Sequence, residues 1–204
     1  MSALEARNVS CARGDVRLFR DISFTVAAGE WVAVRGANGS GKTTLLRCIA
    51  GLTRPEAGEV VWDGKPARGA VGFRGAMLYA GHSLGIKDEL SAEENLRDAL
   101  ALRGVAFESP ALDDALASAG LARRRHLPAG RLSAGQRRRI SMARLVLDPA
   151  NLWILDEPLT ALDAEGESMF TSLLERHLRR GGSALVATHH AIATPQAREV
   201  GLSQ

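Results

Sequence analysis

One short string limits what this chain can fold into more than any other feature. Residues 36–43 read G-A-N-G-S-G-K-T, which fits the phosphate-binding pattern G-x-x-x-x-G-K-[ST]. The string follows an expected strand, Trp31–Arg35, and precedes an expected helix, Thr43–Ala50, which is the context that this pattern requires. The alternative, a chance glycine-rich turn, does not account for strand, loop and helix in that order. The sequence therefore predicts a nucleotide site in an α/β fold.

Each part of the string has a physical role in holding phosphates. Glycines let backbone N–H groups point at phosphate oxygens, and the helix N-terminus adds partial positive charge. Lys42 is expected to reach the β- and γ-phosphates, and the Thr43 hydroxyl is expected to bind Mg²⁺. The expected nucleotide-binding residues are Gly36, Ala37, Asn38, Gly39, Ser40, Gly41, Lys42, Thr43 and Thr44.

Apolar segments alternate with helical patterns along most of the chain. Short strands separated by turns are expected between Leu4 and Val34, at 16–19, 22–26 and 31–34. Further strands are expected at 58–62, 77–80, 152–155 and, as the last buried one, 184–187. Further helices are expected at 91–102, 110–119, 134–147 and 164–180. Apolar strands that alternate with helices imply a mostly parallel sheet with helices on both faces.

The segment from Glu89 to Arg131 carries only helical patterns and interrupts this alternation. We therefore expect a P-loop NTPase core with an N-terminal antiparallel β region and an inserted helical sub-lobe. At 204 residues the chain fits a single domain, 1–204, with the core at 1–81 and 132–204 and the sub-lobe at 82–131.

Composition and charge narrow the class of protein. Hydrophobic residues make up 46% and charged residues 24%, which suits a globular core and excludes a disordered or collagen-like chain. No apolar run is long enough for a membrane span, and no export signal is expected at the start. The net charge is only +3, and the clusters at 123–125 and 137–139 are expected to face solvent, or, for the second, the nucleotide and an opposing protomer. Cys11 and Cys48 are too few for a zinc site, and no bridge between them is expected.

Two acids end the apolar strand Leu152–Leu155, and charge at the tip of a buried strand is costly unless it meets a cation. Asp156 is expected to hold Mg²⁺ through its water shell, and Glu157 to polarise the attacking water. A solvated strand end is the alternative. Upstream, residues 132–136 read L-S-A-G-Q, with Ser133 placed as a helix N-cap; taken alone, this is an ordinary capped helix.

Taken in order, these strings resemble the ATP-binding subunits of ABC transporters, whose signature reads L-S-G-G-Q; here Ala134 replaces the first glycine. Residues 159–163 look like the D-loop of that family, and Thr188-His189 looks like its switch histidine. The resemblance covers essentially the whole chain.

The resemblance implies an ATP hydrolase that uses ATP and Mg²⁺ and works as a head-to-tail homodimer. Each ATP would lie between the P-loop of one protomer and the signature of the other, Ser133, Ala134, Gly135 and Gln136. Lys42, Glu157 and His189 would form the catalytic set, with His189 on the γ-phosphate, and Asp163 would link the two sites.

Besides Ala134, two positions depart from the family pattern. The place of the aromatic residue that stacks on adenine falls to Arg13, whose guanidinium plane can stack on a base; a solvated turn arginine is the alternative. The place of the Q-loop glutamine falls to His82, which offers one donor and one acceptor as an amide does; a plain loop histidine is the alternative.

Soluble translation or DNA-repair members of the family fit poorly, because this chain has one P-loop and only a short helical insertion. Local strings, such as 81–87 and 152–155, are similar to the cytochrome c biogenesis branch of the family. That similarity implies a transmembrane permease partner, indirect partnership with haem-handling membrane proteins and a haem chaperone, and no nucleic acid. It also implies peripheral attachment at the cytoplasmic face of the inner membrane, where hydrolysis would drive haem export or release of the haem-loaded chaperone. The ATPase of another small-molecule transporter remains the alternative.

Overall fold

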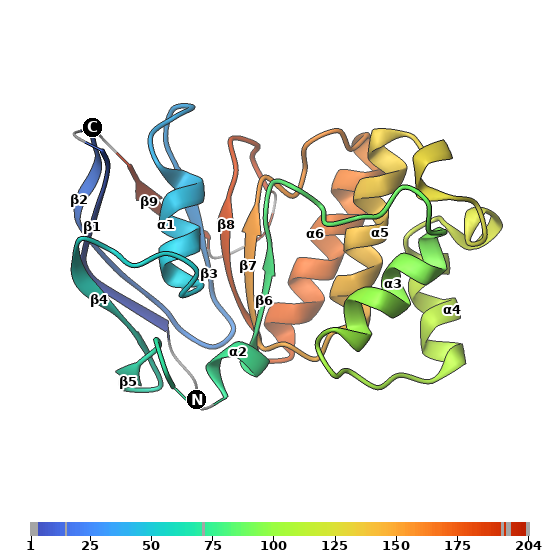
Figure 1. Cartoon of the computed structure of the whole chain (residues 1–204), viewed down its shortest axis with the longest axis horizontal. Helices are drawn as coiled ribbons and strands as arrows, with labels where there is room; N and C mark the ends of the chain where they lie inside the picture. The colour runs from blue at the N-terminus through green and yellow to red at the C-terminus, as the bar shows by residue number, and fades with distance from the viewer. Residues whose placement is uncertain (1–3, 15, 71, 193, 195–196, 203–204) are drawn as a thin grey trace. The chain divides into compact units, whose positions relative to one another are not determined.

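The computed structural model describes residues 4–14, 16–70, 72–192, 194 and 197–202. These residues group into two compact units, shown as a ribbon in Figure 1. The α/β unit comprises residues 1–82, 150–158 and 174–204, and the helical unit comprises residues 83–149 and 159–173. The L-S-A-G-Q string and the helix that starts within it therefore belong to the helical unit.

An antiparallel sheet in the α/β unit has the strand order β2-β1-β4-β5. Its strands are β1 (Leu4–Arg13), β2 (Val16–Val26), β4 (Ala57–Trp62) and β5 (Lys65–Pro66). The two strands expected at 16–19 and 22–26 form the single strand β2, with a bulge between them. Ser10 faces two residues of β2 there; Asp21 takes a positive φ of 51° and donates its N–H to Ser10 Oγ at 2.9 Å.

A parallel sheet in the same unit has the order β6-β7-β8-β3-β9. Its strands are β3 (Trp31–Arg35), β6 (Met77–Ala80), β7 (Leu152–Asp156), β8 (Ser183–Ala187) and β9 (Ala197–Gly201). Every residue of β7 and β8 is buried, as expected for central parallel strands. The expectation that 184–187 is the last buried strand is confirmed as β8, but one more strand, β9, follows it and was not expected. β9 lies at the edge of the sheet beside β3, and its A-R-E-V-G sequence lacks the apolar run that marks the central strands.

Helix α1 (Lys42–Ile49) lies in the core of the α/β unit. Its side chains Leu45, Leu46 and Ile49 are fully buried in one cluster with Val9 and Phe19 of the antiparallel sheet. The cluster also contains residues of β3, β7 and β8, so α1 is packed against both sheets. Because burying each such side chain contributes roughly 1.5–3 kcal/mol, the helix that follows the P-loop is firmly anchored.

The helical unit is built from α3 (Ala92–Ala101), α4 (Ser109–Ser118), α5 (Ala134–Leu147) and two short 3-10 turns, η1 (Ala122–Arg124) and η2 (Ala129–Arg131). Aliphatic side chains of these elements form its own core. A capping box closes the start of α3, because Ser91 Oγ accepts from Glu94 N and Glu94 Oε2 accepts from Ser91 N. Helix α6 (Ala164–Arg179) and the short α2 (Phe73–Ala76) complete the elements.

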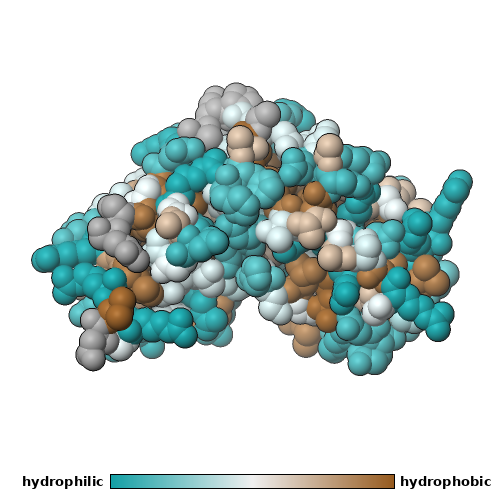
Figure 2. Space-filling model, turned by 90° about the horizontal axis from the view of Figure 1, so that it is seen from above, coloured by the Kyte–Doolittle hydropathy of each residue, from teal (hydrophilic) through white to brown (hydrophobic). Residues whose placement is uncertain are grey.

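The predicted fold class, an α/β P-loop architecture with an antiparallel β region and a helical insertion, is confirmed. No helix among the described residues is long and apolar enough to cross a membrane. Figure 2 shows hydrophobic residues on one face as small groups separated by hydrophilic ones. The large hydrophobic side chains that are exposed, as far as the structure describes the chain, are Val16, Leu52, Leu102 and Leu127.

Candidate functional site

The P-loop between β3 and α1 depends on a glycine at the start of the helix. Gly41 is the N-cap of α1 and has a φ of 98°, which L-residues with side chains rarely adopt. A Cβ at this position would also lie 2.9 Å from Cδ1 of Phe19, so the Phe19 ring in β2 leaves no room for a side chain at Gly41. Phe19 was not predicted as a residue of the site. Phe19 and Gly41 are 22 positions apart in the sequence, so no local sequence pattern predicts their contact.

The P-loop lysine is buried within its own loop. Lys42 is 8% exposed, and its Nζ donates to Gly36 O at 2.8 Å and to Ala37 O at 3.3 Å. Both partners are neutral carbonyl groups, so the positive charge of Lys42 is oriented by them and not neutralised. A cation held in this way suits the binding of anionic phosphates.

The predicted magnesium ligands lie side by side. Thr43 Oγ1 donates to Asp156 Oδ2 at 2.7 Å, which joins the first turn of α1 to the end of β7. The Asp156 side chain is buried. Burial and the nearby Asp156 carboxylate raise the pKa of Tyr79. The pair places two hard oxygen donors next to the P-loop, and such donors are the ligands that Mg²⁺ prefers.

Glu157 and His189 also meet in the structure. Glu157 has a φ of 50°, an uncommon value for a residue with a side chain, and its N–H donates to Ala187 O at 2.8 Å. This turn at the end of β7 brings Glu157 Oε2 to 3.0 Å from Nδ1 of His189. The neighbouring His190 instead donates its backbone N–H to Thr188 Oγ1. The geometry therefore supports His189, not His190, as the partner of the acid.

The signature string lies in the helical unit, at the start of α5. Ser133 Oγ accepts from Gln136 N at 3.2 Å, and Gln136 Oε1 accepts from Ser133 N at 3.1 Å, so the predicted N-cap is a complete capping box. The string borders a hollow of about 590 Å³ that is lined by Gly120, Arg124, Ser133, Ala134, Gly135, Gln136, Arg139, Ala161, Asp163 and Glu165. The four signature residues and Asp163 therefore face a common space.

The D-loop is attached to α5 by an arginine. Arg139 Nη2 lies 2.9 Å from Asp163 Oδ1 and 2.8 Å from Glu165 Oε2, and its side chain is 11% exposed. Hydrogen bonds from Gly166 N–H and from Arg139 lower the pKa of Asp163. The expectation that the 137–139 cluster faces solvent is wrong for Arg139, which is buried and pairs with two acids of its own unit. Its expected position facing the nucleotide and an opposing protomer stays a prediction.

The other basic cluster is also paired. Arg125 forms ion pairs with Glu93 at 2.8 Å and with Asp113 at 2.6 Å. Hydrogen bonds from Arg125, the largest cause, and from Arg97 lower the pKa of Glu93. Within the cluster at 123–125, Arg125 therefore connects the end of η1 to α3 and α4, so the cluster is not only a solvated face.

The two residues that depart from the family pattern lie on the surface of the α/β unit. Arg13 is exposed at the end of β1, opposite Val16 in the hairpin register. His82 is exposed in the loop that follows β6. Their proposed contacts with adenine and with the γ-phosphate remain predictions.

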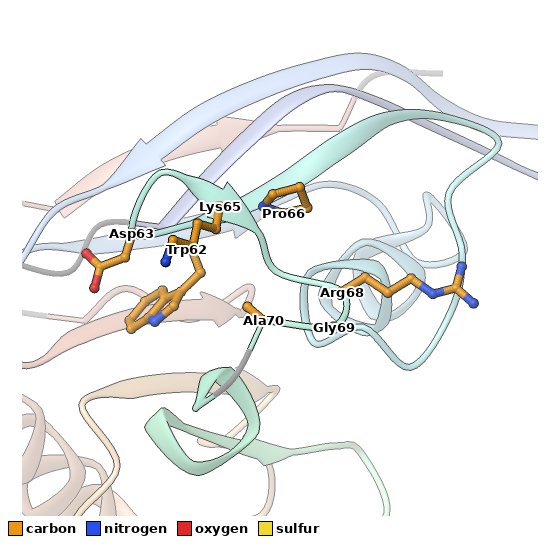
Figure 3. Close-up of a pocket in the computed structure, with 7 residues that line it drawn as sticks. All are labelled: Trp62, Asp63, Lys65, Pro66, Arg68, Gly69 and Ala70. Carbon is orange, nitrogen blue, oxygen red and sulfur yellow. The ribbon is translucent and has the colours of Figure 1, made fainter.

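A second hollow lies beside the β4–β5 hairpin, and its lining does not form a site. It is lined by Trp62, Asp63, Lys65, Pro66, Arg68, Gly69 and Ala70. Figure 3 shows that Arg68 points away from Lys65 and Asp63, so the charged groups do not converge on one ligand.

The cysteines and the other candidate metal ligands add no further centre. Cys11 and Cys48 are free and buried, and burial beside Cys11 raises the pKa of Cys48 to about 12, which keeps that thiol protonated. The residues that the structure describes contain no group of three or more His, Cys, Asp or Glu side chains that could hold a metal ion.

Comparison with known proteins agrees with this geometry. The sequence profile described as "ABC transporter" matches residues 19–160. The chain is 48% identical to the "Cytochrome c biogenesis ATP-binding export protein CcmA" of Nitrosomonas europaea, over 93% of this chain and 89% of the relative. It is also 48% identical to the protein of the same description in Methylococcus capsulatus, over 92% and 91% of the two chains.

Solved structures agree on the fold. A putative ABC transporter ATP-binding protein from Pyrococcus furiosus superposes with a TM-score of 0.84 at 27% identity and covers 97% of this chain and 96% of that one. An ATP-binding cassette solved as a dimer in a post-hydrolysis state with ADP and Pi superposes with a TM-score of 0.85 at 24% identity, over 98% and 94% of the two chains.

Proposed function

Because this chain belongs to the ABC transporter family, we propose that it is the ATP-hydrolysing subunit of an export complex for cytochrome c biogenesis. The observation that carries the activity is the meeting of four predicted residues next to the P-loop, as the pairs Thr43–Asp156 and Glu157–His189. The narrower role is supported by relatives of nearly full length that are named for cytochrome c biogenesis.

ATP is bound by the P-loop in this proposal. Backbone N–H groups of residues 36–44 surround the β- and γ-phosphates, and Lys42 transfers its hydrogen bonds from the carbonyls of Gly36 and Ala37 to phosphate oxygens. Thr43 and Asp156 would hold Mg²⁺, because the 2.7 Å pair that they form offers the oxygen ligands that this ion prefers. The ion would offset negative charge on the phosphates.

Hydrolysis then needs an activated water. Glu157 directly follows β7, and its side chain is 14% exposed. Its carboxylate accepts a proton from the attacking water as the bond to the γ-phosphorus forms. His189 orients Glu157 and the γ-phosphate through its two ring nitrogens. The bond that breaks is the one between the γ-phosphorus and the bridging oxygen, so ATP and water give ADP and phosphate.

The site is completed in trans in this proposal. Two copies associate head to tail, and Ser133 and Gly135 of one copy cap the γ-phosphate held by the other, while Asp163 links the two sites. The support is a hollow that already gathers the signature and Asp163 on one surface, together with the dimeric state of the related ATP-binding cassette. Each copy acts as one ATPase domain, with the helical sub-lobe facing a membrane partner.

We further infer a transmembrane permease as the direct partner, with peripheral attachment at the cytoplasmic face of the membrane. Haem-handling proteins and a haem chaperone are indirect partners, because the energy of hydrolysis is used for haem delivery to c-type cytochromes. His82 is the contact through which the γ-phosphate is sensed, and Arg13 stacks on adenine.

The test of the sandwich uses Glu157→Gln, which keeps the shape of the side chain and removes the proton acceptor. We expect this variant to form a stable dimer with MgATP in size-exclusion chromatography with light scattering. Ser133→Arg in the same background should prevent the dimer without changing nucleotide binding. A Glu157→Gln protein that stays monomeric at saturating MgATP contradicts the sandwich.

The test of the narrower role is recovery of partners from membranes. Tagged protein is purified from gently solubilised membranes, and the co-purifying proteins are identified by mass spectrometry. We expect membrane subunits of cytochrome c maturation. Recovery of an unrelated permease keeps the ATPase mechanism and overturns the haem role, and recovery of ribosomes or DNA overturns the transporter role.

A further inference from the structure

Arg35 makes contacts that neither the P-loop pattern nor the proposed mechanism uses. It is the last residue of β3 and directly precedes Gly36. Its Nη1 donates to Thr188 O at 2.7 Å and to His190 O at 2.7 Å. Its Nε donates to Glu199 Oε1 of β9 at 3.2 Å. One guanidinium therefore ties the strand before the P-loop to the loop after β8 and to the edge strand.

The two carbonyl groups that Arg35 holds lie on either side of His189. The ladder between β3 and β8 ends at the pair Val34 and Ala187, with one further bond from Thr188 N–H to Val34 O at 3.4 Å, so residues 189 and 190 lie beyond the regular ladder. Because one guanidinium nitrogen donates to both carbonyl groups, the peptide group before His189 and the peptide group after His190 are held at one point. Fixing both sides of a residue limits the directions in which its side chain can point.

The side chain that is fixed in this way is itself only lightly supported. The His189 imidazole is 64% exposed; its Nδ1 lies 3.0 Å from Glu157 Oε2, and its ring centroid lies 4.3 Å from that of His190. A ring this exposed depends largely on its backbone for orientation. Because Arg35 also holds the carbonyl of His190, it supports both the backbone of His189 and the residue whose ring contacts it.

We propose that Arg35 is a positioning residue that holds the His189 loop against the P-loop strand. The inference rests on the proposed role of His189 in hydrolysis. Arg35 acts through the carbonyl groups of residues 188 and 190, and Glu199 orients the guanidinium from the other side. Because Glu199 is 60% exposed, its ion pair with Arg35 adds little to the stability of the fold; its role is to orient the Arg35 guanidinium.

The experiment measures steady-state and single-turnover ATP hydrolysis by the full chain with Arg35→Gln. Loss of the groups that orient a functional side chain typically costs about 10–100-fold, so we expect kcat to fall by that factor while the KM for ATP changes less than about twofold. Arg35→Lys restores a cation that can donate to both carbonyls and should recover part of the rate. It also keeps the test valid if Arg35→Gln folds poorly.

A matched control lies on the same edge strand. Arg198 is 59% exposed, and its Nη1 lies 3.6 Å from Glu30 Oε2, away from the His189 loop. Arg198→Gln removes the same charge and should leave kcat and KM unchanged. Equal losses in Arg198→Gln and Arg35→Gln would overturn the proposal, since they would indicate a general effect of charge or of the edge strand.

A second readout does not depend on turnover. The ring nitrogen resonances of His189, assigned by comparison with His189→Ala, should shift in Arg35→Gln and stay unchanged in Arg198→Gln. Unchanged resonances in Arg35→Gln, or a rise in KM with kcat preserved, contradict the positioning role. If His189→Ala and Glu157→Gln both hydrolyse ATP normally, the proposed function fails first; if they are inactive while Arg35→Gln is normal, this inference alone fails.

Discussion

The P-loop face of the α/β unit and the signature face of the helical unit use their cations in different ways. In the α/β unit, Lys42 donates to the carbonyls of Gly36 and Ala37. Carbonyl groups orient a cation without cancelling its charge, so this charge remains available to a phosphate. The helical unit instead pairs its arginines with carboxylates.

These pairs span the helical unit: Arg103–Asp148, Arg125–Glu93, Arg125–Asp113, Arg137–Asp88, Arg139–Asp163 and Arg139–Glu165. Most arginines near the signature end of α5 therefore have their charge balanced, although Arg124, which also lines the hollow, is in none of these pairs. The other donors for a phosphate at that face are the helix N-terminus and the Ser133 hydroxyl, which are weaker but directional. The P-loop face thus relies mainly on the charge of Lys42, and the signature face mainly on directional donors.

The most severe test of this contrast compares Lys42→Met with Arg139→Met in the isolated protein. Lys42 makes charge-assisted hydrogen bonds, each worth about 1.5–3 kcal/mol, so its loss should weaken MgATP binding by about 100-fold or more. Arg139→Met should change the same affinity by less than about threefold, because its charge is taken by Asp163 and Glu165. Isothermal titration of both variants measures the difference, and equal losses would break the comparison.

Much of the fold follows from local patterns. The P-loop, the capping boxes at Ser91 and Ser133, and the alternation of apolar strands with helices are all short-range features, and the structure has each of them. The pairs Thr43–Asp156 and Glu157–His189 also follow from sequence, because a pattern places each residue at the end of a parallel strand or at a helix start.

Other features depend on contacts that no local pattern encodes. β9 is a charged edge strand that is held by the backbone of β3 and not by an apolar run. The acid partners of Arg139 and Arg137 lie 24 and 49 positions away along the chain, so the clusters look unpaired in the sequence. Arg35 contacts carbonyl groups more than 150 positions away. Because every residue has a backbone carbonyl, the residue types at 188 and 190 do not indicate this contact.

The signature glycine offers a finer test of the helical face. A Cβ at Gly135 would lie 2.8 Å from Ala161 O of the D-loop, while Ala134 is exposed and already carries a Cβ. Gly135→Ala should lower the free energy of unfolding by about 1–3 kcal/mol, because a backbone oxygen must move. Ala134→Gly should cost no more than about 1 kcal/mol, the difference in helix propensity.

Urea unfolding followed by circular dichroism measures both variants. If direction is what the signature face supplies, Gly135→Ala should also prevent the MgATP dimer of the Glu157→Gln background, whereas Ala134→Gly should allow it. A Gly135→Ala protein that is as stable as the unmodified chain and still dimerises would show that the packing of the signature against the D-loop does not set the geometry of that face.

The smallest expected effect concerns a difference between the histidines of the two units. In the α/β unit, the ring of His177 stacks on Trp153 at 3.8 Å and its Nε2 lies 3.1 Å from Ser183 O; burial lowers the pKa of His177. In the helical unit, the side chain of His126 is 80% exposed. The two imidazoles therefore differ in burial.

The sign of the effect follows from where the proton binds more tightly. Because the folded-state pKa of His177 lies below the unfolded value of about 6.5, the unfolded chain takes up the proton first. The stability that His177 contributes is complete above about pH 6.5 and is lost as the pH falls from there toward the lowered pKa, with a slope of at most about 1.4 kcal/mol per pH unit. The lowered pKa values of Glu93 and Asp163 act in the same direction but at more acidic pH.

Urea unfolding between about pH 7.5 and pH 5.5 isolates the histidine contribution, because unperturbed carboxylates titrate below this range. His177→Gln should be less stable at neutral pH, since its packing on Trp153 is lost, but its stability should vary less with pH than that of the unmodified chain. His126→Gln is the control and should keep the original slope. If His177→Gln keeps that slope and His126→Gln loses it, the acid-sensitive histidine belongs to the helical unit, and the contrast between a buried and an exposed imidazole is reversed.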